Sequence, residues 1–252
     1  MNSEIILKSV SLDFPIYDAE SLSLRNKVSD IGKVISKKTK KTSKGKIVSA
    51  VKDINFEFRH GDRVALLGHN GSGKTTLLKL LAGIYSPTSG SICKCGETCS
   101  MLDIGFGFEQ DATGFENILL SNIIRGRTKK EIDKILPEIA EFSGLGEFLD
   151  MPLRTYSSGM QARLAFSSVI ANSPEILLID EFFSTGDIEF SRKSEERVMK
   201  MMSDSSILVF ASHDLKLLKT ICDKGVCMEN GKIIFSGEVS EAINFYTKIY
   251  EK

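Results

Sequence analysis

The feature that most constrains this chain is a glycine-rich loop set between a predicted strand and a predicted helix. The loop, Gly68-His69-Asn70-Gly71-Ser72-Gly73-Lys74-Thr75, fits the pattern G-x-x-x-x-G-K-[ST] at every fixed position. The apolar run 64–67 before it is typical of a buried strand, and the Leu-rich stretch 76–81 after it is typical of a helix. Strand, loop and helix therefore stand in the order that a phosphate-binding loop requires.

The residue types in this loop have physical roles toward a phosphate. Three glycines let the backbone curl until its N–H groups converge on phosphate oxygens, and the helix N-terminus adds a partial positive charge. Lys74 is predicted to reach the β- and γ-phosphates, and the Thr75 hydroxyl to ligate Mg²⁺. The predicted nucleotide-binding residues of the loop are Gly68, His69, Asn70, Gly71, Ser72, Gly73, Lys74, Thr75 and Thr76. The alternative is a glycine-rich turn with a chance lysine.

Two further apolar runs end in polar residues. The run 176–179 leads into Asp180 and Glu181, and the run 207–211 leads to His213. Neither run alternates, which is typical of parallel strands covered on both faces, and open α/β sheets bind ligands outside the carboxyl ends of such strands. Asp180 is predicted as a Mg²⁺ partner, Glu181 as the residue that polarises an attacking water, and His213 as a γ-phosphate contact. The alternatives are a helix N-cap with a first-turn acid for the two carboxylates and a core imidazole for the histidine.

A helical segment separates the loop from these carboxylates. Residues 128–131 form a capping box, and a Ser-rich turn at Ser157 predicts a second helix that runs to about Ala171. Such a helix of about 12 residues spans ~18 Å. Ser157 and Gly159 are therefore expected far from Lys74 of the same chain, where they would serve another subunit's nucleotide.

Composition narrows the class of protein. A chain of 252 residues fits one large domain, or a domain with an inserted subdomain. No apolar run approaches the ~18 residues of a spanning helix, and the N-terminus carries an acidic residue where a signal peptide is basic. Five cysteines, an odd number, fit reduced thiols better than a disulfide framework. We therefore expect a cytosolic chain.

Charge is balanced over the whole chain but not along it. Basic and acidic residues number 33 each, yet the segment 25–46 holds nine basic residues against the single acid Asp30. One interpretation is a solvated surface loop. The other is a surface that meets anionic lipid headgroups or a phosphate-bearing substrate.

The order of these motifs resembles that of ATP-binding-cassette (ABC) ATPases. The resemblance rests on the phosphate loop (Walker A), the helical insert, the signature Tyr-Ser-Ser-Gly-Met at 156–160, the Ile-Asp-Glu sequence at 179–181 and the Ser-His pair at 212–213. It implies that Ser157 and Gly159 complete the γ-phosphate site of a second copy in a head-to-tail homodimer. It also implies that the segment 184–187 links the two sites and that His213 is the switch histidine.

Finer features resemble a subgroup, the bacterial exporters of O-antigen, capsule and teichoic acid. These features are the signature 156–160, the acids 180–181 followed by 186–187, the segment 113–118, and the extended N-terminal stretch 14–17 with its basic insertion. The resemblance implies an ATP-hydrolysing subunit, peripheral on the cytoplasmic side of the cytoplasmic membrane. Its cofactors would be ATP and Mg²⁺, and its partners an integral membrane permease and a lipid-linked polysaccharide, with no nucleic acid. The alternatives are a soluble ABC ATPase that acts on DNA or ribosomes, and a P-loop kinase, which the signature opposes.

Some positions are not assigned by the sequence. The family's Q-loop glutamine would fall near Ile104 or Gly105, so no glutamine is assigned, and the Gly-rich segment 102–108 is placed at the membrane-subunit interface. Tyr17 is the first choice for the aromatic that stacks on adenine and Phe14 the second. Cys93, Cys95 and Cys99 fit no zinc spacing well and are interpreted as fortuitous thiols.

The expected fold is α/β: a P-loop NTPase of the ABC type with an antiparallel β subdomain and a helical subdomain insertion. The whole chain, 1–252, would form one ABC ATPase domain. Within it we expect a basic N-terminal insertion at 14–49, a helical subdomain at 116–172, and a C-terminal hairpin and helix at 223–252, with an Asn-Gly turn in the hairpin.

Overall fold

A computed structural model describes residues 3–16, 46–102, 104–171, 174–181 and 188–250. Most of the predicted basic insertion, Tyr17 and the predicted linking loop 184–187 lie outside the described residues. No helix in the described part of the chain has the length and apolar character needed to cross a bilayer.

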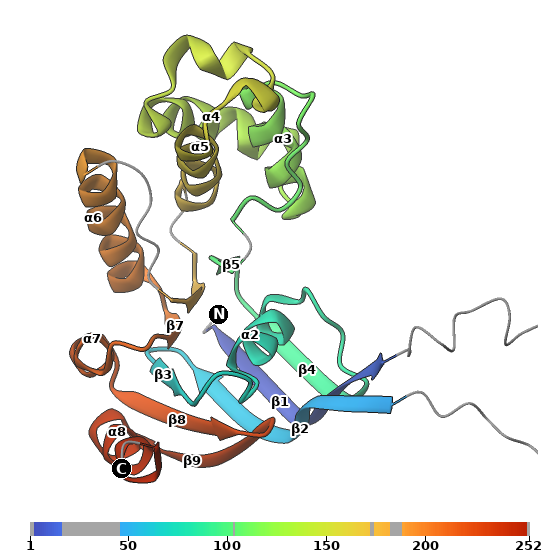
Figure 1. The fold of residues 1–252 in the computed structure, drawn as a ribbon, viewed down its shortest axis with the longest axis vertical. Coiled ribbons are helices and arrows are strands. Elements are labelled where there is room, and N and C mark those ends of the chain that lie inside the picture. Colours follow the sequence, from blue (N-terminus) through green and yellow to red (C-terminus); the bar gives the residue numbers. More distant parts are fainter. Residues whose placement is uncertain (1–2, 17–45, 103, 172–173, 182–187, 251–252) are drawn as a thin grey trace, which may run out of the picture.

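A six-stranded sheet forms the centre of the molecule (Figure 1). Its order is β5-β6-β7-β3-β8-β9, in which neighbouring strands from β5 to β8 are parallel and β9 is antiparallel to β8. The strands are β5 (Thr98–Ser100), β6 (Ile176–Asp180), β7 (Ile207–Ala211), β3 (Arg63–Leu67), β8 (Lys224–Glu229) and β9 (Lys232–Glu238). The three predicted apolar runs are thus confirmed as adjacent buried parallel strands.

A second, antiparallel sheet packs over one face of the first. It has the order β2-β1-β4 and consists of β1 (Glu4–Ile16), β2 (Lys46–Arg59) and β4 (Ser89–Cys95). Helix α2 (Lys74–Ala82) contributes Leu77, Leu78 and Leu81 to the core that the two sheets share. Because β1 and β2 pair as far as Ile16 opposite Lys46, the ends of the range predicted for the insertion lie within this sheet.

Helices cover the other face of the central sheet. They are α6 (Ile188–Asp204), α7 (Leu215–Ile221) and α8 (Val239–Tyr250). A core of residues such as Phe166, Phe190, Met201 and Phe210 joins α5 (Ser158–Ile170) and α6 to the sheet. The predicted fold class, an α/β domain with an antiparallel sheet and a helical insertion, is confirmed.

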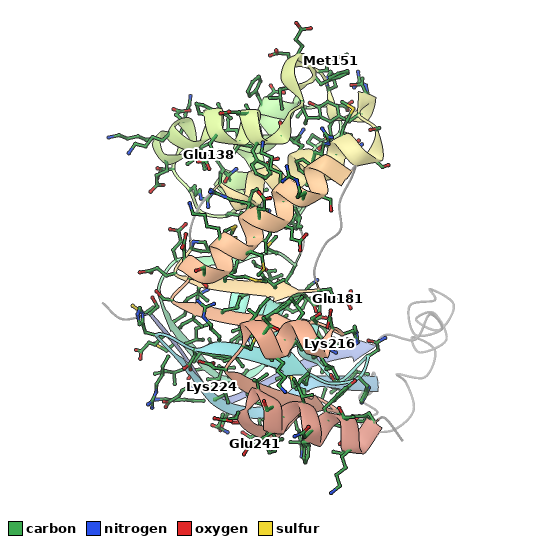
Figure 2. All side chains as sticks on the ribbon, turned by 90° about the vertical axis from the view of Figure 1, so that its left-hand side faces the viewer. Glu138, Met151, Glu181, Lys216, Lys224 and Glu241 are labelled. Carbon is green, nitrogen blue, oxygen red and sulfur yellow. The ribbon has the colours of Figure 1, made fainter. Side chains whose placement is uncertain are left out.

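The helical insertion extends away from the sheets, with Met151 at its tip and Glu181 at the sheet (Figure 2), and the carboxyl-terminal part of its last helix packs against the central sheet. It consists of α3 (Gly114–Ile124), α4 (Lys129–Ser143), α5 (Ser158–Ile170) and two short 3₁₀ turns, η1 (Gly146–Asp150) and η2 (Leu153–Thr155). Capping boxes begin α3 and α4, the second of them as predicted. The insertion has its own core, which includes Ile118, Ile139, Leu153 and Leu164.

Candidate nucleotide-binding and catalytic site

The glycine-rich loop folds between β3 and α2 as its sequence predicts. Gly68 has a φ of 154°, and a Cβ there would lie 2.5 Å from Ser72 Oγ and 2.6 Å from the Met228 carbonyl oxygen. Only glycine therefore fits this position. The loop curls so that Lys74, the first residue of α2, donates from Nζ to the carbonyl oxygens of Gly68 at 2.5 Å and His69 at 3.3 Å.

Residues from four segments of the chain meet at the carboxyl ends of β3, β6 and β7. A cavity of about 320 Å³ is lined by Asn70, Lys74, Thr75, Leu102, Asp180, Glu181 and His213. The Thr75 hydroxyl donates to Asp180 Oδ2 at 2.5 Å, and His213 Nε2 lies 3.3 Å from Glu181 Oε1. The structure thus brings together the predicted Lys74, Thr75, Asp180, Glu181 and His213.

Charge and backbone geometry distinguish Lys74 and Glu181 within this group. Burial lowers the pKa of Lys74, and the negative charges of Asp180 and Glu181 oppose that shift. A bound anionic ligand would also raise the pKa of Lys74 and so stabilise the charged form of this buried ammonium. Glu181 has a φ of 63°, a conformation that is costly for a non-glycine residue and is concentrated at functional sites. Its carboxylate remains exposed to solvent and is thus accessible to a water or substrate.

The oxygen atoms beside Lys74 fit a hard cation. Mg²⁺ is usually held by one or two carboxylates together with substrate phosphates, and it keeps several waters. The Thr75 hydroxyl and the Asp180 carboxylate supply such donors at the mouth of the phosphate loop. Among the described residues there is no cluster of three or more His, Cys, Asp or Glu that would hold a metal by itself.

A second hollow, of about 390 Å³, extends from the loop along the antiparallel sheet. The loop and α2 line it from Asn70 to Thr76, and the opposite walls come from Val48, Lys52, Asn230 and Gly231. The sequence predicts a hairpin turn at Asn230-Gly231, and the positive φ values of 49° and 81° confirm it. The local pattern gives no sign that this turn also lines the nucleotide site. Gly231 donates to the Ser72 carbonyl oxygen at 2.9 Å, so the turn is fastened to the phosphate loop.

The segment expected to carry a Q-loop glutamine enters the site with an apolar residue. Leu102 lines the cavity beside Lys74 and Asp180, although the sequence placed the whole segment 102–108 at a membrane-subunit interface. Ile104, one of the two positions named for the glutamine, accepts a hydrogen bond at its carbonyl oxygen from Arg125 Nη2 at 3.1 Å. Arg125 follows α3, so this contact ties the segment to the helical insertion.

The signature residues lie in the helical insertion, away from the cavity. Ser157 caps α5, and its hydroxyl accepts from the Met160 backbone N–H at 3.2 Å, as the sequence predicts. Helix α5 has 13 residues, about 20 Å at 1.5 Å per residue, and its carboxyl end leads back to β6 (Figure 1). Ser157 is exposed and Gly159 half-buried, and neither lines the cavities that Lys74 lines.

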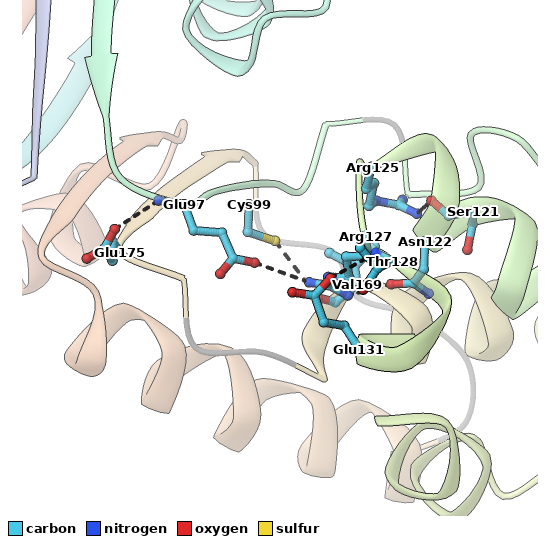
Figure 3. A network of polar contacts seen from close by, with 10 residues as sticks. All are labelled: Glu97, Cys99, Ser121, Asn122, Arg125, Arg127, Thr128, Glu131, Val169 and Glu175. Atoms are coloured by element: carbon cyan, nitrogen blue, oxygen red, sulfur yellow. Dashed lines mark hydrogen bonds and ion pairs between the residues drawn. The ribbon is translucent and has the colours of Figure 1, made fainter. Parts of the chain in front are cut away.

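A groove with both apolar and basic walls opens where the helical insertion joins the sheets. It encloses about 550 Å³ between the end of α2, the β4–β5 turn and the end of α3, and its walls include Ile84, Phe106, Ile124 and Arg125. Beside it, a polar network crosses from insertion to sheet (Figure 3). In this network Arg127 donates to the side chain of Asn122 and lies 3.8 Å from Glu97, whose backbone N–H donates to Glu175 at 2.9 Å.

The predicted adenine-stacking aromatics are not placed at the site. Tyr17 lies outside the described residues, and Phe14 packs edge-to-face on Tyr85 with ring centroids 5.5 Å apart. Phe14 therefore has an ordinary packing role, and it does not line the cavities beside the phosphate loop. Cys93 is exposed, whereas Cys99 is buried, and burial raises its pKa to about 11.

Comparison with known proteins gives one consistent group. Residues 51–184 match the family model described as "ABC transporter". The chain is 42% identical over 236 residues to the O-antigen export system ATP-binding protein RfbE of Yersinia enterocolitica, covering 92% of this chain and 96% of that protein. It is 37% identical to RfbB, of the same description, from Klebsiella pneumoniae, with 98% of both chains covered.

A more distant relative has a related description, and a solved structure shares the fold. The teichoic acids export ATP-binding protein TagH of Shouchella clausii is 34% identical, and the match covers 98% of this chain and 66% of that protein. Among solved structures, a dimeric ATP-binding cassette in a post-hydrolysis state with ADP and Pi has a TM-score of 0.62 at 20% identity. It covers 93% of this chain and 98% of the cassette, which shows a shared fold.

Proposed function

Because this chain belongs to the ABC transporter family and is an ABC ATPase, we propose that it is the ATP-hydrolysing subunit of an exporter of lipid-linked polysaccharide. The observation that supports this most is similarity along nearly the full length of both chains to O-antigen export ATP-binding proteins. The polymer would be O-antigen or a related polysaccharide, and the protein would act on the cytoplasmic face of the membrane as a peripheral subunit.

The polar residues of the cavity each have a role in the proposed hydrolysis. The loop from Gly68 to Thr76 binds the phosphates through backbone N–H groups, and Lys74 supplies a positive charge to the β- and γ-phosphates. Glu181 orients the attacking water and accepts its proton, and His213, 3.3 Å from that carboxylate, contacts the γ-phosphate. Thr75 and Asp180 would hold Mg²⁺, which would supply positive charge to neutralise the phosphates.

A second copy of the chain completes the site in this proposal. The exposed N-terminus of α5, with Ser157 and Gly159, is a helix end suited to an anion, and among the described residues it does not line the cavities beside Lys74 of its own chain. A head-to-tail dimer would place it over the γ-phosphate bound by the partner subunit. A solved cassette of the same fold is described as dimeric.

The groove between insertion and sheets is where we place the permease. Phe106 and Ile124, which are 64% and 52% exposed, line the groove, and Leu120 and Ile123, on the same helix as Ile124, are 38% and 48% exposed. Contiguous exposed apolar surface of this kind marks an interaction site. Because the Ile104–Arg125 contact joins this surface to the segment that carries Leu102, a protein bound there would be coupled to the nucleotide site.

Isolation of the tagged native protein from solubilised membranes tests this proposal. We expect a multi-span membrane permease to copurify, and lipid-linked polysaccharide to accumulate in cells that express an inactive chain. Copurification of ribosomes or DNA instead would favour the soluble ABC ATPase that the sequence left as an alternative.

A pair of surface variants tests the docking site. Phe106→Asp should reduce copurification of the permease while the ATPase activity of the isolated chain is kept, because Phe106 does not line the nucleotide cavities. Phe148→Asp is the matched control. Phe148 is also exposed, at 48%, but it lies in η1 beside Met151 at the tip of the insertion and does not line the groove. Equal loss of the permease in both variants would contradict the proposed docking site.

A further inference from the structure

The C-terminal helix ends beside the phosphate loop because of the strand register. Strand β8 runs parallel to β3 with Leu67 opposite Cys227, so Glu229, at the end of β8, reaches the level of the loop. Strand β9 returns, and α8 begins where the Val239 backbone N–H donates to the Asp223 carbonyl oxygen at 3.0 Å. The 12 residues of α8 then span ~18 Å, about the length of β8, and bring Tyr250 to the loop.

One stripe of α8 fixes this placement. Ala242, Tyr246 and Tyr250 follow each other at intervals of four residues and therefore share a face of the helix. Ala242 packs so tightly on β8 that a Cβ at Gly225 would lie 2.3 Å from its own Cβ. Tyr246 packs against the core under the sheet, with its ring 5.1 Å from that of Tyr250.

Tyr250 contacts the phosphate loop through its ring. The rings of Tyr250 and His69 lie 5.5 Å apart at 62°, an edge-to-face contact. The Tyr250 hydroxyl is buried near Glu229, and burial together with that carboxylate raises the pKa of Tyr250 to about 12. The ring therefore lies between the loop and the end of β8.

His69 is the residue through which this contact reaches the site. Its carbonyl oxygen accepts from the Ser72 backbone N–H at 3.1 Å and from Lys74 Nζ at 3.3 Å. Its ring Nδ1 lies 2.6 Å from the Asn70 carbonyl oxygen. A shift of the His69 ring would therefore move the peptide that organises both the loop and its lysine.

We propose that Tyr250 is a positioning residue for the phosphate loop, which holds His69 so that the loop is ready to receive phosphates. Nucleotide affinity, rather than turnover of bound nucleotide, then depends on the C-terminal helix. This inference rests on the ATPase activity of the chain and is independent of what is exported.

Histidine NMR and steady-state kinetics on the full chain test the proposal. The chain has three histidines, so the carbon-bound ring protons of His69 can be assigned by comparison with His69→Ala. In Tyr250→Ala these signals should lose their ring-current shift, and the KM for ATP should rise about threefold to tenfold with kcat unchanged. Tyr250→Phe keeps the ring and should restore both. Ile249→Ala, at an exposed neighbouring position, should change neither.

The coupling itself is tested in a His69→Ala background. There, Tyr250→Ala should add no further loss of affinity, because the residue through which it acts is already removed. Unchanged His69 signals in Tyr250→Ala, a fall in kcat at constant KM, or an equal effect of Ile249→Ala would each overturn the proposal. An unchanged KM in Tyr250→Ala would also overturn it, whereas failure of a permease to copurify with the unaltered chain would bear on the exporter assignment and not on this contact.

Discussion

Two helix N-termini in this molecule are suited to anions, but their surroundings differ. Helix α2 begins at Lys74 beside Thr75, Asp180 and Glu181, and no side chain caps its N-terminal N–H groups. Helix α5 begins at the solvent-exposed pair Ser157-Ser158. The Ser157 hydroxyl already accepts a hydrogen bond from one N–H group of this helix end.

We propose that the catalytic work is divided accordingly. The phosphate loop has its lysine, the proposed cation ligands and the proposed general base on one chain, at adjacent strand ends. The N-terminus of the signature helix does not line the cavities beside Lys74 of its own chain. In the proposed dimer the first region binds and hydrolyses ATP, whereas the second contributes when the partner subunit's nucleotide site is brought to it.

The largest effect is expected at the strained carboxylate of the first region. Glu181→Gln should slow ATP hydrolysis by about 10²- to 10⁴-fold, because the attacking water loses its proton acceptor. ATP binding should be normal, since the phosphate loop is untouched. Phosphate release and equilibrium binding of a fluorescent ATP analogue measure the two effects. Full ATPase activity would remove Glu181 from the mechanism.

A smaller effect is expected at the lysine of the same region. Lys74→Ala removes a charge-assisted contact worth about 1.5–3 kcal/mol, which corresponds to a loss of ATP affinity of about 10- to 150-fold. Isothermal titration with ATP and Mg²⁺ measures it, with Lys79→Ala, on the same helix but outside the cavities, as the control. Unchanged affinity of Lys74→Ala would contradict the role given to the loop.

The first region could be predicted from sequence because its structure is local. The loop, its glycines and its lysine lie within eight residues. Buried parallel strands can be recognised in the sequence as unbroken apolar runs. The strand ends that carry Asp180 and His213 then meet by the general rule for parallel sheets. For the same reason the capping box at Thr128 and the Asn230-Gly231 turn were predicted correctly.

Contacts that depend on register could not be predicted in this way. The turn at Asn230 reaches the phosphate loop only because Leu67 lies opposite Cys227, and nothing in the local pattern fixes that pairing. Tyr250 reaches His69 through the same register and the length of α8. Leu102 was assigned to an interface because glycines and aromatics dominate its segment, whereas the path of the chain after β5 turns it into the cavity.

The smallest effect concerns the second region and tests whether it acts on another chain. In the Glu181→Gln background, ATP should drive dimerisation, because bound nucleotide that is not hydrolysed links the two copies. Sedimentation with ATP and Mg²⁺ should show the dimer. A monomer at saturating ATP would contradict the head-to-tail arrangement.

Removal of one signature hydroxyl sharpens that test, provided that its role as a helix cap is separated from its role toward a phosphate. Ser157→Ala in the same background should weaken the ATP-dependent dimer by about twofold to tenfold, the net value of one hydrogen bond of about 0.5–1.5 kcal/mol. It also removes an N-cap, which costs about 1 kcal/mol of stability.

Thr113→Ala is the matched control, because Thr113 caps α3 in the same insertion with the same kind of bond. If Thr113→Ala weakens the dimer as much as Ser157→Ala does, the effect comes from the stability of the insertion. If only Ser157→Ala does so, the N-terminus of α5 binds the partner's nucleotide.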